Sequence, residues 1–159
     1  MRSGSDRARH EGHSQKATGG SRWQVTMVLV DTSLWVGHFR RSNPVLRSLL
    51  ETDQVLCHPL VVLELACGTP PAPRERTLGD LRMLRQAVVA TTEETLALVE
   101  KQRPYDSGCG AIDVALLASV LLTRGARLWT ADNRLDVLAA RLGVACNPAR
   151  AGKSPRRPQ

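Results

Sequence analysis

Four acidic side chains that could take part in catalysis or metal binding lie within or just after largely apolar stretches of the sequence. Asp31 directly follows the run MVLV, and Asp132 ends the run RLWTAD. Glu64 is the one polar residue of LVVLELAC, and Asp113 shares AIDVALLASVLL with a single other polar residue, Ser119. An ionised carboxylate in apolar surroundings is costly unless it is paired with a cation or bound to a metal ion. These four carboxylates are therefore the candidates for a chemical site.

Each of the four also has a purely structural explanation. Asp31 and Asp132 follow predicted strands and precede predicted helices, so each can act as a helix N-cap. Asp113 falls in the first turn of a predicted helix, where the helix dipole favours negative charge. Glu64 can lie on a solvent-exposed helix face. Asp136 lies one turn after Asp132 on the same helix face, where it either joins the site or is simply solvated.

The elements that must position these residues alternate between short strands and helices. The sequence predicts strands at 27–30, 54–59, 87–92, 126–132 and 144–148. It predicts helices at 32–40, 42–51, 60–68, 78–86, 93–103, 111–125 and 133–143. This alternation is typical of the α/β class, and we expect a three-layer α/β/α domain with a central parallel sheet of four to five strands.

Such a sheet binds ligands at the carboxyl ends of its strands, which is where Asp31 and Asp132 fall. Glu64 and Asp113 follow strand-to-helix turns that can face the same edge. Carboxylates gathered in one pocket repel one another unless a divalent cation neutralises them, and oxygen-only ligands favour Mg²⁺ or Mn²⁺ over zinc. Ser33 is placed to add a hydroxyl to this site or to bind a water there, although it can equally serve the first helical turn; Thr130 is a weaker candidate.

The charge of the chain is concentrated at its two ends. The net charge is +7, but residues 1–26 hold five basic and two acidic residues, and residues 150–159 hold four basic residues and no acid. Residues 27–149 contain thirteen residues of each sign. We therefore expect a disordered extension at 1–26, a single folded domain at 27–148 and a basic disordered tail at 149–159. Basic tails of this kind add salt-sensitive attraction to phosphates.

Several classes of protein are disfavoured by what the sequence lacks. No apolar run approaches the ~20 residues that span a bilayer, and the basic N-terminus has no apolar segment typical of a secretory signal. The four cysteines form no CxxC pair, and the four histidines complete no zinc pattern. We expect reduced, mostly buried thiols in a cytoplasmic protein without a membrane association. No GxGxxG or GxxxxGK[ST] loop follows a strand, which disfavours a dinucleotide binder or phosphotransferase.

The stretches VDTSLW, ELACG, GCGAIDVALLAS and ARLWTADNRLDVLAARLGV, taken in order, resemble the PIN-domain proteins, specifically the VapC-type ribonuclease toxins of type II toxin–antitoxin systems. The resemblance runs from Met27 to about Cys146. It places the family's acidic positions at Asp31, Glu64, Asp113 and Asp132 and the hydroxyl position at Ser33, and it implies a PIN-like fold.

The resemblance implies a Mg²⁺- or Mn²⁺-dependent endoribonuclease that cleaves structured RNA, such as a tRNA or ribosomal RNA. It also implies a homodimer and a cognate antitoxin that occludes the site. In this interpretation Asp31 and Asp113 are the principal metal ligands, and Asp132 binds directly or through water. Glu64 orients a water or completes a second metal site. Hydrolysis by metal-activated water would leave a 5′-phosphate and a 3′-hydroxyl.

Other functions remain open at the level of sequence. The protein could be a non-catalytic PIN-like module that binds RNA or scaffolds an antitoxin, or a nuclease that acts on DNA with the same metal chemistry. RNA affinity would come from the tails and from scattered arginines, of which Arg40, Arg41 and Arg134 are candidates. The low aromatic content of 3% disfavours extensive base stacking.

Overall fold

The computed structural model describes residues 26–148. The extensions predicted for residues 1–26 and 149–159 lie outside the described residues, except for Thr26. The described chain alternates strands and helices in the order β1 (Met27–Val30), α1 (Thr32–Arg40), α2 (Pro44–Glu51), β2 (Val55–Cys57), α3 (Pro59–Cys67), α4 (Arg74–Met83), β3 (Arg85–Gln86), α5 (Thr92–Gln102), α6 (Ala111–Leu122), β4 (Ala126–Trp129) and α7 (Asn133–Arg141).

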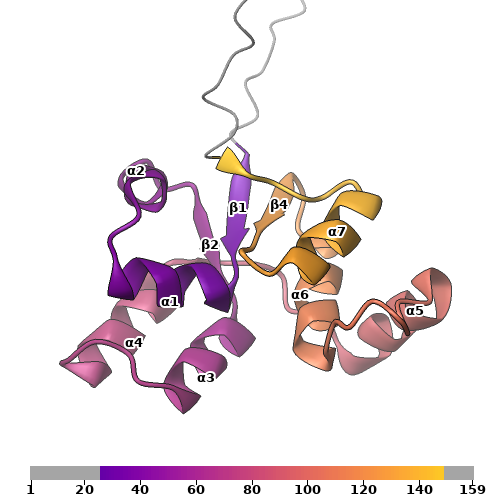
Figure 1. The fold of residues 1–159 in the computed structure, drawn as a ribbon, viewed down its shortest axis with the longest axis horizontal. Helices are drawn as coiled ribbons and strands as arrows, with labels where there is room; N and C mark the ends of the chain where they lie inside the picture. Colours follow the sequence, from indigo (N-terminus) through magenta and orange to yellow (C-terminus); the bar gives the residue numbers. More distant parts are fainter. Residues whose placement is uncertain (1–25, 149–159) are drawn as a thin grey trace, which may run out of the picture.

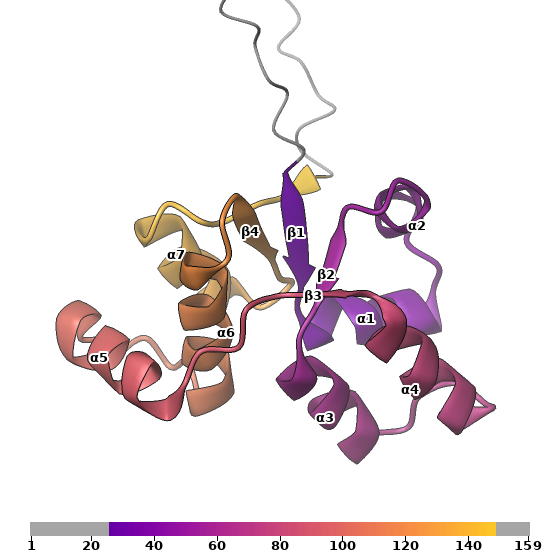
Figure 2. The ribbon, with the colours of Figure 1, turned by 180° about the vertical axis from the view of Figure 1, so that it is seen from behind.

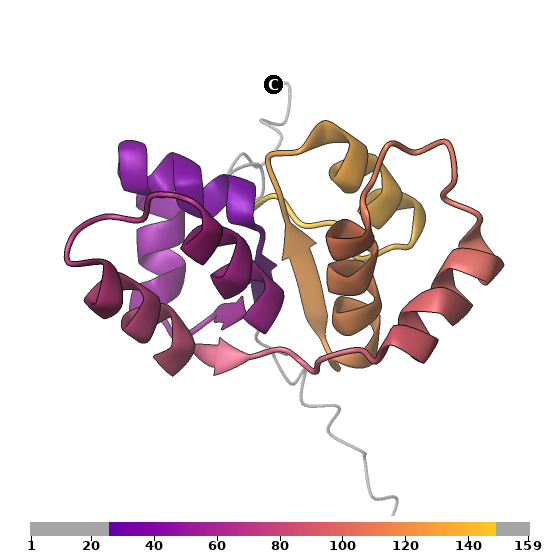
Figure 3. The ribbon, with the colours of Figure 1, turned by 90° about the horizontal axis from the view of Figure 1, so that it is seen from below.

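The four strands form one parallel sheet in the order β3-β2-β1-β4. Crossovers between parallel strands are right-handed, so connections that run in opposite directions along the sheet cover opposite faces. The chain moves outward from β1 through β2 to β3 and then returns to β4 beyond β1. Helices α1–α4 accordingly lie on one side of the sheet and α5–α7 on the other (Figure 1 and Figure 3). This is the predicted three-layer α/β/α fold with a parallel sheet of four strands.

The neighbouring strands β1 and β4 mark the point where the direction of the connections reverses. The helix after β1 covers one face and the helix after β4 covers the other, as Figure 2 shows from behind. Open parallel sheets bind ligands at such a switch point, outside the carboxyl ends of the strands. The strands are in register here, with Val30 beside Trp129, so Asp31 and Thr130 leave the sheet side by side. The topology thus creates the edge at which the candidate residues meet.

Helix starts follow the local chemistry of the sequence. The Asn43 side chain accepts hydrogen bonds from the backbone N–H groups of Val45 and Leu46, and Pro44 occupies the first helical position of α2. Thr91 and Glu94 form a reciprocal capping box at the start of α5. The predicted bounds of α1 are confirmed, and those of α2, α3, α5 and α7 are confirmed to within a residue or two.

The core is built on the central strand. Val28, Leu29 and Val30 of β1 are each at most 2% exposed, as expected for a strand covered by helices on both faces. All four cysteines are free thiols, but Cys57 alone is buried and Cys67 is exposed, so the expectation of mostly buried thiols is wrong. No helix within residues 26–148 is long and apolar enough to cross a membrane.

The strands predicted at 54–59 and 126–132 are shorter in the structure, as β2 and β4, and two other predicted strands differ more. The sequence predicts a strand at 87–92, but β3 consists of Arg85 and Gln86. The reason is that β2 has three residues, and the hydrogen bond from the Ala87 N–H to the Cys57 carbonyl is the last that β2 accepts before it turns into α3. The strand predicted at 144–148 is reduced to a single bridge between Leu128 and Ala145.

Two predicted helices also have different bounds. Helix α4 begins four residues before the predicted Leu78, because Arg74 donates hydrogen bonds to the carbonyls of Ala66 and Gly68 and so fixes the chain after α3. Helix α6 ends at Leu122 rather than at residue 125. Thr123 follows it in an extended conformation, and its hydroxyl accepts a hydrogen bond from the backbone N–H of Val88.

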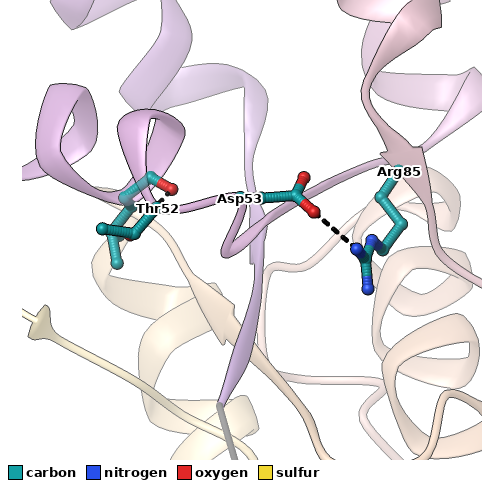
Figure 4. Close-up of polar contacts among 4 residues, drawn as sticks. Thr52, Asp53 and Arg85 are labelled. Atoms are coloured by element: carbon teal, nitrogen blue, oxygen red, sulfur yellow. Dashed lines mark hydrogen bonds and ion pairs between the residues drawn. The ribbon is translucent and has the colours of Figure 1, made fainter.

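The edge of the sheet farthest from the switch point is fixed by an ion pair. Asp53, which has a left-handed φ of 53° in the turn after α2, contacts Arg85 at 2.5 Å (Figure 4). Both side chains are largely exposed. Exposed pairs of this kind stabilise proteins by about 0–1 kcal/mol, so the contact positions β3 more than it stabilises the fold.

A buried hydrogen-bond chain joins the helices that carry Glu64 and Asp113. His58 caps α3 by accepting the Leu60 N–H on Nδ1, so the neutral ring carries its proton on Nε2 and donates it to the Ser119 hydroxyl at 3.0 Å. Ser119 on α6 in turn donates to the Ala115 carbonyl and accepts from the Ala90 N–H. Helices α3 and α6 are therefore held in a fixed relation through a satisfied polar network.

Candidate active site

Asp31 is the most enclosed of the candidate residues, with 5% of its surface exposed. It follows β1 and caps α1, and its Oδ2 atom accepts three hydrogen bonds. The donors are the Ser33 hydroxyl at 2.6 Å, the Ser33 backbone N–H at 3.2 Å and the Thr130 hydroxyl at 2.9 Å. Asp31 is thereby held at the switch point by groups from both β1–α1 and β4–α7.

The Ser33 hydroxyl has a positioning role in this arrangement. It donates to Asp31 and accepts a hydrogen bond from the Ala131 N–H at 3.0 Å. Its single proton is therefore committed to the carboxylate, which leaves none to donate to a bound water. The sequence indicates Ser33 as part of the site, and the contacts place it there as a support for Asp31.

Asp132 reaches the same edge from the other strand. Its Oδ1 atom caps α7 by accepting the N–H groups of Arg134 and Leu135 at 2.7 and 3.2 Å. The backbone N–H of Asp132 donates to the Thr130 hydroxyl, which itself donates to Asp31. Thr130 consequently links the two aspartates through one oxygen atom.

The negative charges of Asp31 and Asp132 affect the pKa of Asp113. Burial raises the pKa of Asp113, the hydrogen bond from the Gly110 N–H lowers it, and the negative charges of Asp31 and Asp132 raise it further. The net shift of this pKa is upward. Like charges that disfavour ionisation are the signature of carboxylates gathered in one place. Asp31, Asp113 and Asp132 come from three separate segments, and the charges of the first and the last act on Asp113.

Glu64 joins this edge from the side of α3. Its Oε2 atom accepts a hydrogen bond of 2.6 Å from the hydroxyl of Thr32, the residue directly after Asp31. Glu64 also lines a cavity of about 510 Å³ between α1 and the end of α3, together with Arg40. Glu64 does not lie on a fully solvent-exposed helix face, because its side chain is half-buried and hydrogen-bonded to Thr32 of α1.

Each of the four carboxylates uses one oxygen for these structural contacts and leaves the other free. Within residues 26–148, every hydrogen bond to them ends on Oδ2 of Asp31, Oε2 of Glu64, Oδ2 of Asp113 or Oδ1 of Asp132. Neither ion pair found in that part of the chain involves any of them. The capping and ligand-binding interpretations are therefore compatible, because a capping aspartate keeps one oxygen for a ligand.

The donor set fits a hard divalent cation in its chemistry. It consists of carboxylate oxygens, none of which forms an ion pair within residues 26–148, and such ligands suit Mg²⁺ or Mn²⁺. In the described part of the chain, however, no three His, Cys, Asp or Glu side chains stand close enough together to hold an ion in their present positions. Binding would require the free oxygens to turn toward one another.

The family of the protein follows from comparison with known sequences. The PIN-domain family model matches residues 28–141, which include all four carboxylates and nearly the whole described domain. The chain belongs to the PIN-domain family.

Comparison with curated proteins identifies relatives of the chain within that family. The chain is 47% identical over 119 residues to "Ribonuclease VapC32" of Mycobacterium tuberculosis, in the strains CDC 1551 / Oshkosh and ATCC 25618 / H37Rv. The match covers 75% of this chain and 95% of each relative. The VapC-type resemblance of the sequence motifs is thereby confirmed. Among solved structures, PAE2754 from Pyrobaculum aerophilum is similar, with a TM-score of 0.48, 17% identity and coverage of 79% of this chain and 97% of that one.

Two residues of the site are underrated or missed by the sequence patterns. Thr130 is only a weak candidate in the sequence, yet its hydroxyl joins Asp31 to the backbone of Asp132. Its position between a strand and a capping aspartate could have identified it as a site residue from the sequence. Thr32, which fixes Glu64, carries no such signal, because the contact spans thirty-two positions in sequence.

Proposed function

We propose that this protein is an endoribonuclease toxin that requires Mg²⁺ or Mn²⁺ and cleaves structured RNA such as a tRNA or ribosomal RNA. The observation that carries the proposal is the set of four carboxylates with one free oxygen each at the switch point of the sheet. Its sequence similarity to proteins named as VapC32 ribonucleases supports the same activity.

The roles of the residues follow from their surroundings. Asp31 and Asp113 would be the principal metal ligands, since one is buried and the other has a raised pKa that a cation would relieve. Asp132 would bind directly or through water, and Glu64 would orient a water or complete a second ion site. Ser33 and Thr130 hold Asp31 in place, so that its free oxygen has a fixed direction.

Cations at this edge would supply two kinds of chemistry, namely a lower pKa for a nearby water and neutralisation of charge on the phosphodiester. The protein's own part is to position the carboxylates and to leave one oxygen of each free. Hydrolysis with water as the nucleophile leaves a 5′-phosphate and a 3′-hydroxyl on the two RNA products.

The proposal extends to the partners of the protein. A VapC-type protein is expected to act in the cytoplasm as a homodimer and to be neutralised by a cognate antitoxin. The exposed side chains of Leu96 and Tyr105, on the rim of an apolar cavity of about 620 Å³, support binding of some protein partner. Light scattering of the protein alone and with the product of its neighbouring reading frame tests both associations.

One observation favours a second candidate function, a non-catalytic PIN-like module that binds RNA or scaffolds an antitoxin. In the described part of the chain the carboxylates stand too far apart to share an ion as placed. If they never close around a cation, the protein would bind RNA without turnover.

Cleavage assays decide between the two. Purified protein is incubated with a structured RNA and Mg²⁺ or Mn²⁺, with EDTA as the metal-free control. We expect metal-dependent cleavage that Asp31→Asn reduces at least a hundredfold. Asp80→Asn, the same chemical change on exposed α4, is the matched control and should cleave normally. Equal cleavage by Asp31→Asn and the unmodified protein would refute the proposed site, and binding without any cleavage would favour the module.

A further inference from the structure

We propose that Arg103, Arg134 and Arg141 bind the phosphate backbone of the RNA strand on one side of the scissile bond. This inference rests on the proposed function and names where that substrate lies. The three arginines line one cavity of about 550 Å³ between α7 and the loop that joins α5 to α6. Figure 3 shows that loop passing beside α7.

The cavity carries an excess of positive charge. Asp106 is the acidic residue in its lining, against three guanidinium groups. Within the described chain, none of these arginines takes part in an ion pair. Arg141 donates one hydrogen bond, to the Gln102 carbonyl at 2.9 Å, which leaves its other donors available. Guanidinium groups with free donors match phosphate oxygens in charge and geometry.

The side chain of Arg134 is held in position by contact with the backbone before any ligand binds. Its side chain lies against Gly108, where an added Cβ would stand 2.9 Å from Cδ and 3.0 Å from Nη1. Gly108 has a φ of +73°, so the position favours glycine on two grounds. A side chain held against backbone loses less entropy on binding than a free one.

The cavity adjoins the carboxylates directly. Asn133 and Arg134, which line it, follow Asp132 in the first turn of α7. The charges of Asp113, Asp132 and Arg134 all act on the pKa of the Cys109 thiol, although burial and the hydrogen bond with Ser107 affect it more. A strand whose phosphodiester lies over Asp132 therefore has its next phosphates beside the arginines.

An acidic polypeptide is the competing occupant, because glutamate side chains are also attracted to guanidinium groups. The continuity with the carboxylates favours RNA: a phosphodiester must cross that edge to be cleaved. The lining also offers few apolar anchors of the kind that define protein interfaces, with Pro104, Val137 and Leu138 as the apolar members.

The test measures binding of a synthetic single-stranded oligoribonucleotide to the full-length protein in EDTA, so that cleavage plays no part. We compare the unmodified protein, the double variant Arg103→Gln/Arg141→Gln and the matched control Arg82→Gln/Arg124→Gln. The control removes the same charge from exposed arginines on α4 and on the turn before β4. Arg103→Gln alone is a further variant, since its side chain makes no hydrogen bond within residues 26–148 and its replacement should leave the fold intact.

We expect the double variant to bind about tenfold more weakly at low salt. The slope of log affinity against log salt should fall by about 0.7 for each phosphate that an arginine no longer neutralises, so by about 1.4 for the pair. The control should change the slope little. Equally weakened binding in test and control variants, or unchanged binding in the test variants, would overturn the proposal. Displacement of the RNA by an equal concentration of poly-glutamate would also overturn it, in favour of an acidic polypeptide.

This result is distinguishable from failure of the proposed function. Binding in EDTA does not require the carboxylates to hold a metal ion, whereas abolished cleavage in Asp31→Asn reports on the carboxylates. A protein that binds RNA through the arginine cavity but never cleaves it would uphold this inference and reject the enzymatic proposal.

Discussion

The hydroxyl of Thr130 donates a hydrogen bond of 2.9 Å to Oδ2 of Asp31 and joins the ends of β1 and β4. The two residues are ninety-nine positions apart in sequence. They meet because the strands are in register and the connections that follow them leave toward opposite faces of the sheet. This bond fixes the most buried carboxylate of the site against the segment between β4 and Asp132.

Replacement of Thr130 by valine should weaken both stability and activity. Valine keeps the shape but removes the donor to Asp31 and the acceptor for the Asp132 N–H. We expect the free energy of unfolding by urea to fall by about 1–2 kcal/mol, together with slower RNA cleavage. Thr130→Ser, which keeps the hydroxyl, should restore most of the cleavage rate. If valine and serine variants cleave equally, the hydroxyl does not position Asp31.

Replacement of Asp113 by asparagine should stabilise the protein at neutral pH while it removes activity. The pKa of Asp113 is raised in the folded state, so the folded protein holds this proton more tightly than the unfolded chain. Its stabilising effect is present at low pH and is lost as the pH rises through the folded pKa. At pH 7 the ionised carboxylate therefore costs stability, and asparagine avoids that cost while its oxygen still accepts the Gly110 N–H.

The expected gain is about a few tenths of a kcal/mol at pH 7, typical of partly exposed charges. It should shrink as the pH is lowered toward 3.8, the ordinary pKa of the group. Urea unfolding at several pH values measures it. A variant that is less stable than the unmodified protein at pH 7, with its fold intact, would contradict the upward shift of the Asp113 pKa.

The network of His58 and Ser119 should make the fold sensitive to acid. Burial lowers the pKa of His58, and Nδ1 of its ring accepts the Leu60 N–H, so a protonated ring would lose the cap of α3. Stability from the neutral ring is complete above the ordinary pKa of 6.5 and is lost as the pH falls below it toward the folded value.

Replacement of His58 by asparagine keeps a capping oxygen but removes the titrating group. The fall in the urea midpoint between pH 7 and pH 5 should be shallower in this variant. His38 has a lowered pKa as well, from burial and then from the charge of Arg47, so His38→Asn is the comparison variant and should remove a separate part of the fall. An unchanged pH dependence in His58→Asn would refute the assignment.

Much of the site could be predicted from the sequence because the roles of its residues depend on their neighbours in the chain. Asp31 directly follows β1, Asp132 comes shortly after β4, and each caps a helix; both positions and both capping roles follow from neighbouring residues. The parallel sheet follows from the alternation of strands and helices. What sequence could not give is which carboxylate oxygen stays free, since that depends on contacts such as Thr32 with Glu64 across two helices.

The errors in the predicted elements have a physical cause as well. Residues 87–92 are apolar and β-branched enough to predict a strand, but a strand needs a partner of matching length. β2 ends at Cys57 because Pro59 begins α3, so Val88 and Val89 have no strand beside them and remain about half exposed. Residues 87–92 do have a high propensity for β-structure, but the folded domain places no strand of matching length beside them.

The proposed activity requires that the free oxygens of the four carboxylates jointly bind a hard divalent cation. Titration calorimetry with Mn²⁺ on the full-length protein, on Asp31→Asn and on Asp80→Asn tests it without reference to RNA. We expect saturable binding by the unmodified protein and by Asp80→Asn, and binding at least tenfold weaker by Asp31→Asn. A silent titration of the unmodified protein, or identical binding by Asp31→Asn, would contradict it.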